Sequence, residues 1–191
     1  PSICRIQIDV VDGKFASPVS WPYTAPEELR NRAERNEMLP ALDRFEYEID
    51  LMCLDAERVV GAWITLGATR LVFHAESAVD LPRLLSSMRR RYGAGDGFVS
   101  GLVSYGVAIN VASDLKIIES CLKEISFVQF MGIARIGRQG QPFDHRVLDK
   151  IRTFHKKYPN IPLQIDGGVS LDNMRELSLL GITSFVVGSA I

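Results

Sequence analysis

Short apolar runs alternate along the chain with longer segments in which apolar residues recur at helical spacing. The apolar runs are nearly continuous, without strict alternation of apolar and polar residues, which is typical of parallel strands covered on both faces. Strands are predicted at seven places, namely 3–10, 46–53, 70–76, 106–111, 127–133, 163–166 and 184–188.

The intervening segments carry recognisable helix signals. The sequence "TAPE" at 24–27 has the form of a T-x-x-E capping box, with Pro26 in the first turn. Apolar stripes at helical spacing follow Asp55 and recur over 115–125 and 147–158. These stripes are interpreted as core packing and predict no cofactor-binding motif.

The last predicted helix has a marked start and end: Ser170 is its expected N-cap, and the helix runs through Leu180 to end at Gly181. A succession of strand–helix units predicts a parallel sheet with right-handed crossovers. Seven units fit a TIM (β/α)8-type barrel that lacks one repeat better than an open Rossmann sheet, since no G-x-G-x-x-G follows the first strand. We expect residues 1–191 to form one α/β barrel domain.

Composition narrows the class of protein. The 191 residues are 47% hydrophobic and 24% charged, and the formal net charge is −1, so no general attraction to nucleic acid or to a membrane surface is expected. Cys4, Cys53 and Cys121 lie far apart and form no C-x-x-C pair, which fits buried thiols in a reducing compartment. No run of 18 apolar residues and no signal pattern occur, and we expect a cytoplasmic protein. The Gly-rich, initially basic segment 89–101 is interpreted as a solvated helix end and a surface loop.

Both ends of the sequence are unusual. It begins at Pro1 without a methionine, and it stops at "SFVVGSAI", an apolar strand with nothing after it. Because domains rarely leave such a strand uncovered, we expect an excerpt of a longer chain or a shortened relative of a larger fold.

Two aspartates follow apolar strands at widely separated places. Asp9 lies inside the run "IQIDVVDGKF", and Asp166 precedes two glycines in "LQIDGGV". Burying an unpaired charge is costly, so a functional role is favoured for both over a simple turn or cap role. Asp12, next to a glycine, is interpreted as a turn residue. In a barrel the carboxyl ends of the strands share one mouth, which is expected to gather Asp9, Asp50, His74, Asn110, Met131 and Asp166.

Several segments resemble motifs of ribulose-phosphate 3-epimerases, in order along the chain. The segment at 6–15 is similar to H-x-D-x-M-D-G-x-F, and "YEIDLMCLDAERVV" is similar to D-x-H-L-M-V-x-x-P-E-R. "LVFHAES" resembles F-H-x-E, and "GVAINVASDL" resembles G-V-A-L-N-P-A-T-P-L. "IGRQGQPF" resembles the phosphate loop P-G-F-G-G-Q-x-F, and the closing segment 165–191 follows D-G-G-V…N…L…G…V-V-G-S-A-I. The family's first strand and helix, and its last helix, have no counterpart in this sequence.

The resemblance implies an isomerase of carbohydrate metabolism that interconverts D-ribulose 5-phosphate and D-xylulose 5-phosphate, or related ketose phosphates. In that family two aspartates transfer protons through a metal-stabilised enediolate, and the matching residues are Asp9 and Asp166. The family's metal site has two histidines and these two aspartates, and this sequence has Gln7 and Asp50 in place of the histidines. An oxygen-rich set of Gln7, Asp9, Asp50 and Asp166 favours Mg²⁺ or Mn²⁺ over Zn²⁺. The sequence leaves two alternatives open: the protein binds a different metal from that of the family, or it binds no metal.

The same resemblance implies a site for the sugar phosphate. Backbone N–H groups of glycine turns bind phosphate without basic side chains, and the positions that match are Gly137, Gly140, Gln141, Gly167, Gly168, Gly188 and Ser189. Arg135 and Arg138 either add phosphate contacts or face solvent. His74, Met52 and Met131 match pocket residues of the family, although each is equally consistent with core packing. The resemblance also allows a homo-oligomer.

A second function stays open from the sequence. The exchanged residues Gln7 and Asp50 are also what a non-catalytic sugar-phosphate-binding relative without the metal would show. A hexulose-phosphate synthase is disfavoured, because the strand "EYEIDLM" lacks the lysine of that family's D-x-K-x-x-D motif.

Overall fold

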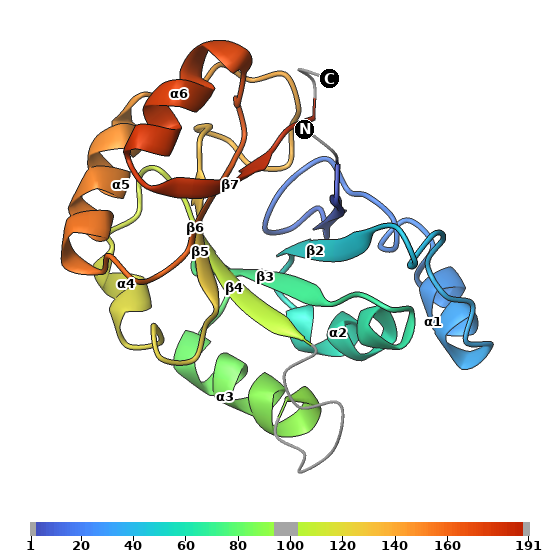
Figure 1. Ribbon diagram of the computed structural model, residues 1–191. Coiled ribbons are helices and arrows are strands. Elements are labelled where there is room, and N and C mark those ends of the chain that lie inside the picture. Colours follow the sequence, from blue (N-terminus) through green and yellow to red (C-terminus); the bar gives the residue numbers. More distant parts are fainter. Residues whose placement is uncertain (1–2, 94–102, 189–191) are drawn as a thin grey trace.

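The computed structural model describes residues 3–93 and 103–188, in which strands and helices alternate along the chain (Figure 1). The strands are β1 (Arg5–Val11), β2 (Glu46–Met52), β3 (Arg70–His74), β4 (Ser104–Ile109), β5 (Phe127–Met131), β6 (Leu163–Asp166) and β7 (Ile182–Val186). The helices are α1 (Pro26–Glu34), α2 (Ala56–Thr65), α3 (Leu81–Tyr92), α4 (Lys116–Glu119), α5 (Arg146–Lys157) and α6 (Leu171–Leu179). All seven predicted strands are confirmed, each within two residues at its start.

The strands form one parallel sheet in sequence order, β1 to β7. The sheet curls so strongly that its first strand meets its last ones, as Figure 1 shows. Gln7 on β1 donates to Asp166 on β6 over 2.9 Å, and Arg5 lies 3.5 Å from the Ser184 hydroxyl on β7. The sheet is thus a curled, partly open barrel of the TIM type, and the predicted α/β fold class is confirmed.

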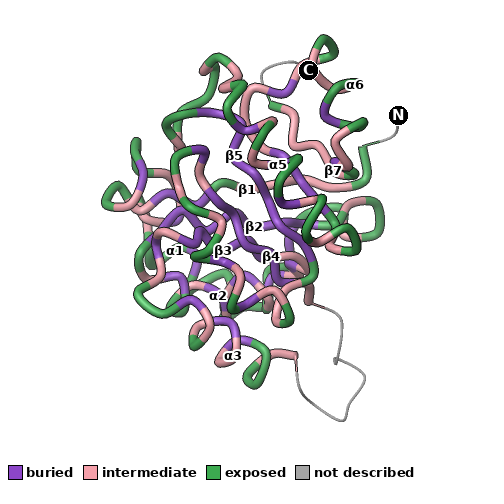
Figure 2. The backbone as a smooth tube through the Cα atoms, turned by 90° about the vertical axis from the view of Figure 1, so that its left-hand side faces the viewer, coloured by how far each residue is buried: buried purple, intermediate pink, exposed green. Residues whose placement is uncertain are grey.

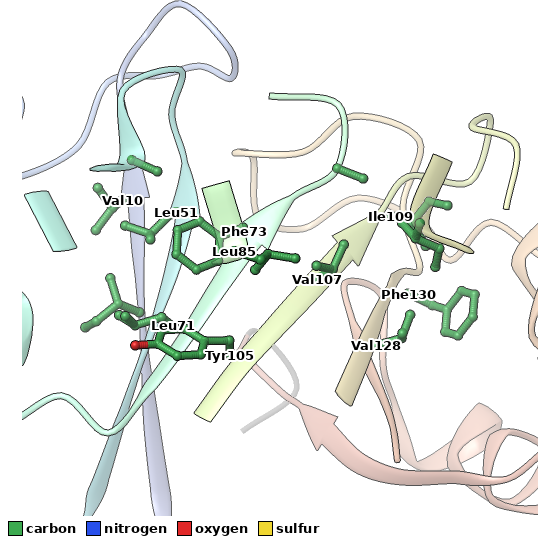
Figure 3. Packing of buried hydrophobic residues seen from close by; sticks show 14 of the residues in the cluster. Val10, Leu51, Leu71, Phe73, Leu85, Tyr105, Val107, Ile109, Val128 and Phe130 are labelled. Carbon is green, nitrogen blue, oxygen red and sulfur yellow. The ribbon is translucent and has the colours of Figure 1, made fainter. Parts of the chain in front are cut away.

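The main hydrophobic core lies between the convex face of the sheet and the helices. Every second residue of the strands points outward into it, as Figure 3 shows for Val10, Leu51, Phe73, Val107 and Phe130. Helices α2, α3 and α5 contribute Trp63, Leu85 and Phe154, all almost inaccessible to solvent. Burial of each such side chain contributes about 1.5–3 kcal/mol. Figure 2 shows that the buried residues run along the strands at the centre of the molecule, with exposed residues on the surrounding helices and loops.

Three predicted helices begin where the sequence indicated. Asp55 is the N-cap residue of α2, and the stripe over 147–158 lies on α5. Ser170 caps α6 through a capping box in which the Asn173 side chain accepts from the Ser170 N–H. The basic start of segment 89–101, Arg89 to Arg91, forms the last turn of α3, and Gly93 is the C-cap residue of that helix. The rest of that segment lies outside the described residues.

The capping box predicted at 24–27 is wrong. Helix α1 begins at Pro26 with Ala25 as the N-cap and without a side-chain cap. The N–H of Thr24 bonds to the Ser20 carbonyl, so Thr24 belongs to the turn before the helix. Glu27 pairs with Arg30 on the helix surface and does not reach back to the cap.

The long helix predicted over 115–125 is also wrong, since α4 ends at Glu119. Beyond it the N–H groups of Cys121 and Glu124 bond three residues back, which is the spacing of turns. The Cys121 thiol also donates to the Ile118 carbonyl, a local bond that competes with helix continuation. Ile118 and Cys121 are nevertheless fully buried. The apolar stripe therefore predicted correctly which residues are buried, but it did not predict the backbone conformation.

No helix in the described ranges is long and apolar enough to cross a bilayer.

Candidate active site

Three carboxylates meet inside the barrel at the carboxyl ends of strands. Asp9 and Asp50 are register partners on β1 and β2, and Asp166 is the last residue of β6. One oxygen of each lies within 4.8 Å of the others. Because residues of alternate parity face opposite sides of a strand, the inward position of these residues follows from the outward position of their neighbours Val10, Leu51 and Ile165.

Gln7 links the two aspartates proposed as the acid/base pair. Its amide nitrogen Nε2 donates to Asp9 Oδ1 and to Asp166 Oδ2, over 2.9 Å in both cases. Its amide oxygen Oε1 is buried and has no hydrogen-bond partner. The structure therefore brings Gln7, Asp9, Asp50 and Asp166 together, with the Gln7 N–H group and not its oxygen turned toward the carboxylates.

Burial and neighbouring negative charge together shift the protonation of Asp9 and Asp166. Burial of its carboxyl group, and next the charge of Asp50, raises the pKa of Asp9 to about 6. Burial, followed by the charges of Asp50 and Asp9, raises the pKa of Asp166 to about 8. Both values lie in the range where a carboxyl group can give and take a proton near neutral pH.

His74 lies behind Asp50 and is completely buried. Its Nε2 is 2.9 Å from Asp50 Oδ1, and the Phe15 ring covers it at a centroid distance of 5.4 Å. Burial alone lowers the pKa of this ring, but the charge of Asp50 and the hydrogen bond to it together outweigh burial and raise the pKa. The predicted pocket residue is thus a partner of Asp50 and contributes no surface to a ligand.

The interpretation of Asp12 as a turn residue is confirmed. Its Oδ1 accepts from the N–H groups of Lys14 and Phe15, and its Oδ2 accepts from the N–H of Leu54. These hydrogen bonds lower the pKa of Asp12 against the opposing effect of burial, and they tie the loop after β1 to the loop after β2.

The predicted pocket methionines are both buried in apolar clusters at the same end of the barrel. Met52 packs with Val11 and Ala16, and Met131 packs with Val72 and Ala108 on the inner face. Ile136, in the loop between β5 and α5, packs against both clusters. This loop therefore joins the two apolar clusters, while Asp9 beside them stays exposed to solvent.

The glycines predicted to bind phosphate divide between two surroundings. Gly140, Gln141 and Gly168 line one pocket of about 490 Å³ at the start of α6. Gly137 instead packs against the loop after β1, where an added Cβ would lie 3.0 Å from the Ser17 carbonyl oxygen. Gly167 faces Ile133, and its φ of +96° is one that favours glycine. The phosphate role of these residues stays a prediction.

The structure describes most of the remaining predicted contacts. Gly188 is exposed after β7, and Ser189 lies outside the described residues. Arg135 and Arg138 are exposed on the loop, and their backbone carbonyls accept from the Gln141 amide. Asn110 donates its N–H to Glu76 and its carbonyl accepts from Lys150, so its backbone is held by two charged groups.

Sequence reasoning missed four polar residues that lie directly beneath the carboxylates. Glu48, Gln129 and Gln164 are essentially inaccessible to solvent, and Arg70 forms an ion pair with Glu48 at 2.6 Å. A signal for them exists: each of the three buried residues stands two positions before a predicted mouth residue, namely Asp50, Met131 or Asp166, on the same strand. That spacing places both on the inner face.

The donor set suits a hard divalent cation. Three carboxylates with oxygens within 4.8 Å of one another supply the ligands that Mg²⁺ and Mn²⁺ prefer. Burial first, and the neighbouring aspartate charges next, raise the pKa of Asp9 and of Asp166, and a cation would offset the second of these two effects. The unpartnered Gln7 oxygen points away from these carboxylates and would join them only if the amide turned over. The nearest imidazole, His74, is already engaged with Asp50.

Comparison with known proteins identifies the family of this chain. Residues 3–191 match the model of the ribulose-phosphate 3 epimerase family. The chain belongs to this family. The resemblance found in the sequence motifs is thereby confirmed.

Relatives from bacteria and yeast match along nearly the whole chain. The chain is 30% identical over 190 residues to a ribulose-phosphate 3-epimerase of Serratia marcescens, covering 97% of this chain and 81% of that protein. It is 26% identical to the enzyme of the same name from Buchnera aphidicola subsp. Acyrthosiphon pisum (97% and 75%). It is 23% identical to that from Schizosaccharomyces pombe (97% and 74%).

Proposed function

We propose that this member of the family is an active isomerase that epimerises a ketose phosphate of the D-ribulose 5-phosphate type at its third carbon. The observation that carries the proposal is the convergence of Asp9 and Asp166 on one point. They come from β1 and β6, share the N–H group of Gln7, and both have a pKa raised toward neutrality.

The chemistry assigned to each residue follows from these contacts. One of the two aspartates, in its ionised form, removes the proton from the third carbon, and the other, in its protonated form, returns a proton to the opposite face of the planar enediolate. The Gln7 amide fixes one oxygen of each carboxylate, which leaves the second oxygen of each for the substrate. Ile136 packs over the apolar clusters beside the carboxylates, and Asp9 stays open to solvent, from which it can regain its proton.

Asp9, Asp50 and Asp166 would hold a divalent cation, and Mg²⁺ or Mn²⁺ fits them better than Zn²⁺. Gln7 would add its oxygen only by turning its amide over, and it would then give up its hydrogen bonds to Asp9 and Asp166. When bound, such a cation would offset negative charge that develops on the substrate oxygens. The pocket at Gly140, Gln141 and Gly168 is the proposed seat of the phosphate group.

Conversion of D-ribulose 5-phosphate to D-xylulose 5-phosphate tests the proposal. Wild-type protein is expected to catalyse it, and Asp9→Asn and Asp166→Asn are each expected to lower kcat by at least about 100-fold. Asp43→Asn, at an exposed position away from the site, is the matched control and should keep the wild-type rate. Wild-type rates in both site variants would remove the assignment.

A second candidate is a non-catalytic binder of sugar phosphates. It is favoured by the N–H of Gln7 facing the carboxylates and by the engagement of both Asp50 oxygens with His74 and Gln129. Elemental analysis of protein purified without chelator separates the two functions. Stoichiometric Mg or Mn with turnover supports the enzyme, whereas calorimetric binding of D-ribulose 5-phosphate without metal and without turnover supports the binder.

A further inference from the structure

A buried polar layer lies directly beneath the three carboxylates. Glu48, Gln129 and Gln164 come from β2, β5 and β6, and their side chains are essentially closed to solvent. Buried polar groups persist where their hydrogen bonds are satisfied, and here they bond to one another. The layer connects the ion pair of Arg70 and Glu48, at its base, with the site carboxylate Asp50 above it.

The direction of each bond in this layer is set from the base upward. Arg70 Nε donates to Glu48 Oε2 over 2.6 Å, and its guanidinium is further held 3.8 Å above the Phe127 ring. The ion-paired Glu48 carboxylate only accepts hydrogen bonds. Gln164 must therefore turn its amide nitrogen to Glu48 Oε1, and it does so at 2.6 Å.

The orientation of Gln164 in turn fixes that of Gln129. The same Gln164 nitrogen donates to Gln129 Oε1 over 2.7 Å, and the Gln164 oxygen accepts from the Ser184 hydroxyl over 2.8 Å. With its oxygen committed to Gln164, Gln129 can present only its nitrogen to the site. That nitrogen donates to Asp50 Oδ2 over 2.9 Å.

Asp50 is consequently held at both oxygens, by His74 at Oδ1 and by Gln129 at Oδ2. Two donors on the two oxygens oppose rotation of the carboxylate plane, and they hold an Asp50 oxygen within 4.8 Å of oxygens of Asp9 and Asp166. We propose that Gln129 is a positioning residue of the site, which acts through Asp50 and whose amide orientation is imposed by Gln164 and the Arg70–Glu48 pair. The proposal rests on the proposed function for its kinetic consequence only.

Gln129→Met tests this role, because methionine retains the length and unbranched shape of glutamine and lacks the N–H donor. Gln129 does not reach the mouth, so kcat is expected to fall about tenfold or more while KM changes less than twofold. A residue that only stabilised the fold would lower the melting temperature without this division between kcat and KM.

A spectroscopic readout of Asp50 orientation accompanies the kinetics. The sequence has three histidines, so the ring ¹⁵N–¹H signals of His74 can be assigned by His145→Gln and His155→Gln. In Gln129→Met the His74 Nε2 signal is expected to shift, because Asp50 turns when one of its two donors is lost. Ser184→Ala is the matched control, since it removes a bond of the same layer while Arg70 Nη2 still donates to the Gln164 oxygen.

Each outcome decides the proposal. A lower kcat with a shifted His74 signal in Gln129→Met, and neither change in Ser184→Ala, supports it. Kinetic constants and a His74 signal equal to those of Ser184→Ala overturn it. If Gln129→Met does not fold, Gln164→Met, which frees the Gln129 amide to turn over, is expected to change kcat and the signal in the same direction, and no change overturns the proposal. If wild-type protein proves inactive, the proposed function fails, and the His74 signal alone decides the role of Gln129.

Discussion

Asp9, Asp50 and Asp166 each place a carboxylate oxygen within 4.8 Å of the others, so their negative charges repel one another. The pKa of Asp9 rises to about 6 and that of Asp166 to about 8, from an ordinary value of 3.8. At pH values between 3.8 and the raised pKa of each group, the folded protein holds a proton on that carboxyl group which the unfolded chain has released. The stability that they contribute is present below about pH 4 and is lost as the pH rises through 6 and 8.

This crowding predicts an unusual pH dependence for Asp166→Asn. In the presence of chelator the variant should be more stable than wild type at pH 8.5, by roughly 1–3 kcal/mol after allowance for solvent screening, because it lacks the repelled carboxylate. At pH 5 the difference should be smaller. Urea unfolding at both pH values measures it, with Asp43→Asn as the control. Equal slopes of stability against pH in wild type and Asp166→Asn would contradict the raised pKa.

For single residues, the sequence indicates the catalytic candidates Asp9 and Asp166 better than the residues that hold them in place. Asp9 and Asp166 are recognisable because a carboxylate inside an apolar strand costs free energy that only a function or a partner explains. Gln129 is not, because a single glutamine in "FVQFMGI" carries no chemistry of its own. Its role depends on Asp50, 79 residues earlier in the sequence, and on an amide orientation imposed by Gln164. Such contacts between distant segments cannot be obtained from one strand at a time.

Among the elements, β4 packs a glycine, Gly106, directly against the Phe127 ring of its neighbour β5. A Cβ added at Gly106 would lie 2.3 Å from the Phe127 ring, which packs in turn against Arg70. Gly106→Ala is therefore expected to destabilise the protein by about 2 kcal/mol, through displacement of Phe127. Ser104→Ala on the same strand should stay within about 0.5 kcal/mol of wild type. Chemical denaturation of both variants makes the comparison, and equal stabilities would show that Phe127 adapts without cost.

Helix α6 presents its N-terminus to the proposed phosphate pocket, together with two carboxylates, Asp172 and Glu176, that also line it. These charges oppose a phosphate group. Asp172→Asn is expected to lower KM for D-ribulose 5-phosphate by up to about fivefold at low ionic strength, with kcat unchanged, and the effect should fade at high salt. Asp149→Asn, on the exposed side of α5, is the control. An unchanged KM at low salt would place the phosphate elsewhere.

The elements differ in how well their sequences predict them. The strands are predicted because nearly continuous apolar runs bounded by turns have few other interpretations in an α/β chain. Helix α4 is not, because its apolar stripe is equally satisfied by successive turns that bury Ile118 and Cys121. The start of α1 is missed because Thr24 bonds within the preceding turn. Periodicity reports which residues are buried, and the local hydrogen bonds decide the conformation.

For the whole molecule, a cation at the barrel mouth would join β1, β2 and β6. Mn²⁺ or Mg²⁺ in 100-fold excess over its dissociation constant should stabilise the metal-free protein by about 2.7 kcal/mol at pH 8. Asp50→Asn should weaken this stabilisation strongly, since it removes one of three carboxylates. Thermal unfolding with and without each metal provides the measurement, with Asp43→Asn as the control. Stabilisation of Asp50→Asn equal to that of wild type would remove Asp50 from the metal site.

The most direct test of the account follows the proton on the third carbon of D-ribulose 5-phosphate in D₂O by NMR. With wild-type protein, deuterium is expected at that carbon in both epimers, because Asp9 and Asp166 exchange protons with solvent between turnovers. Asp9→Asn and Asp166→Asn should each interconvert the epimers at less than about 1% of the wild-type rate. Interconversion at the wild-type rate by either variant, with deuterium incorporated, would show that the paired aspartates are not the groups that move the proton.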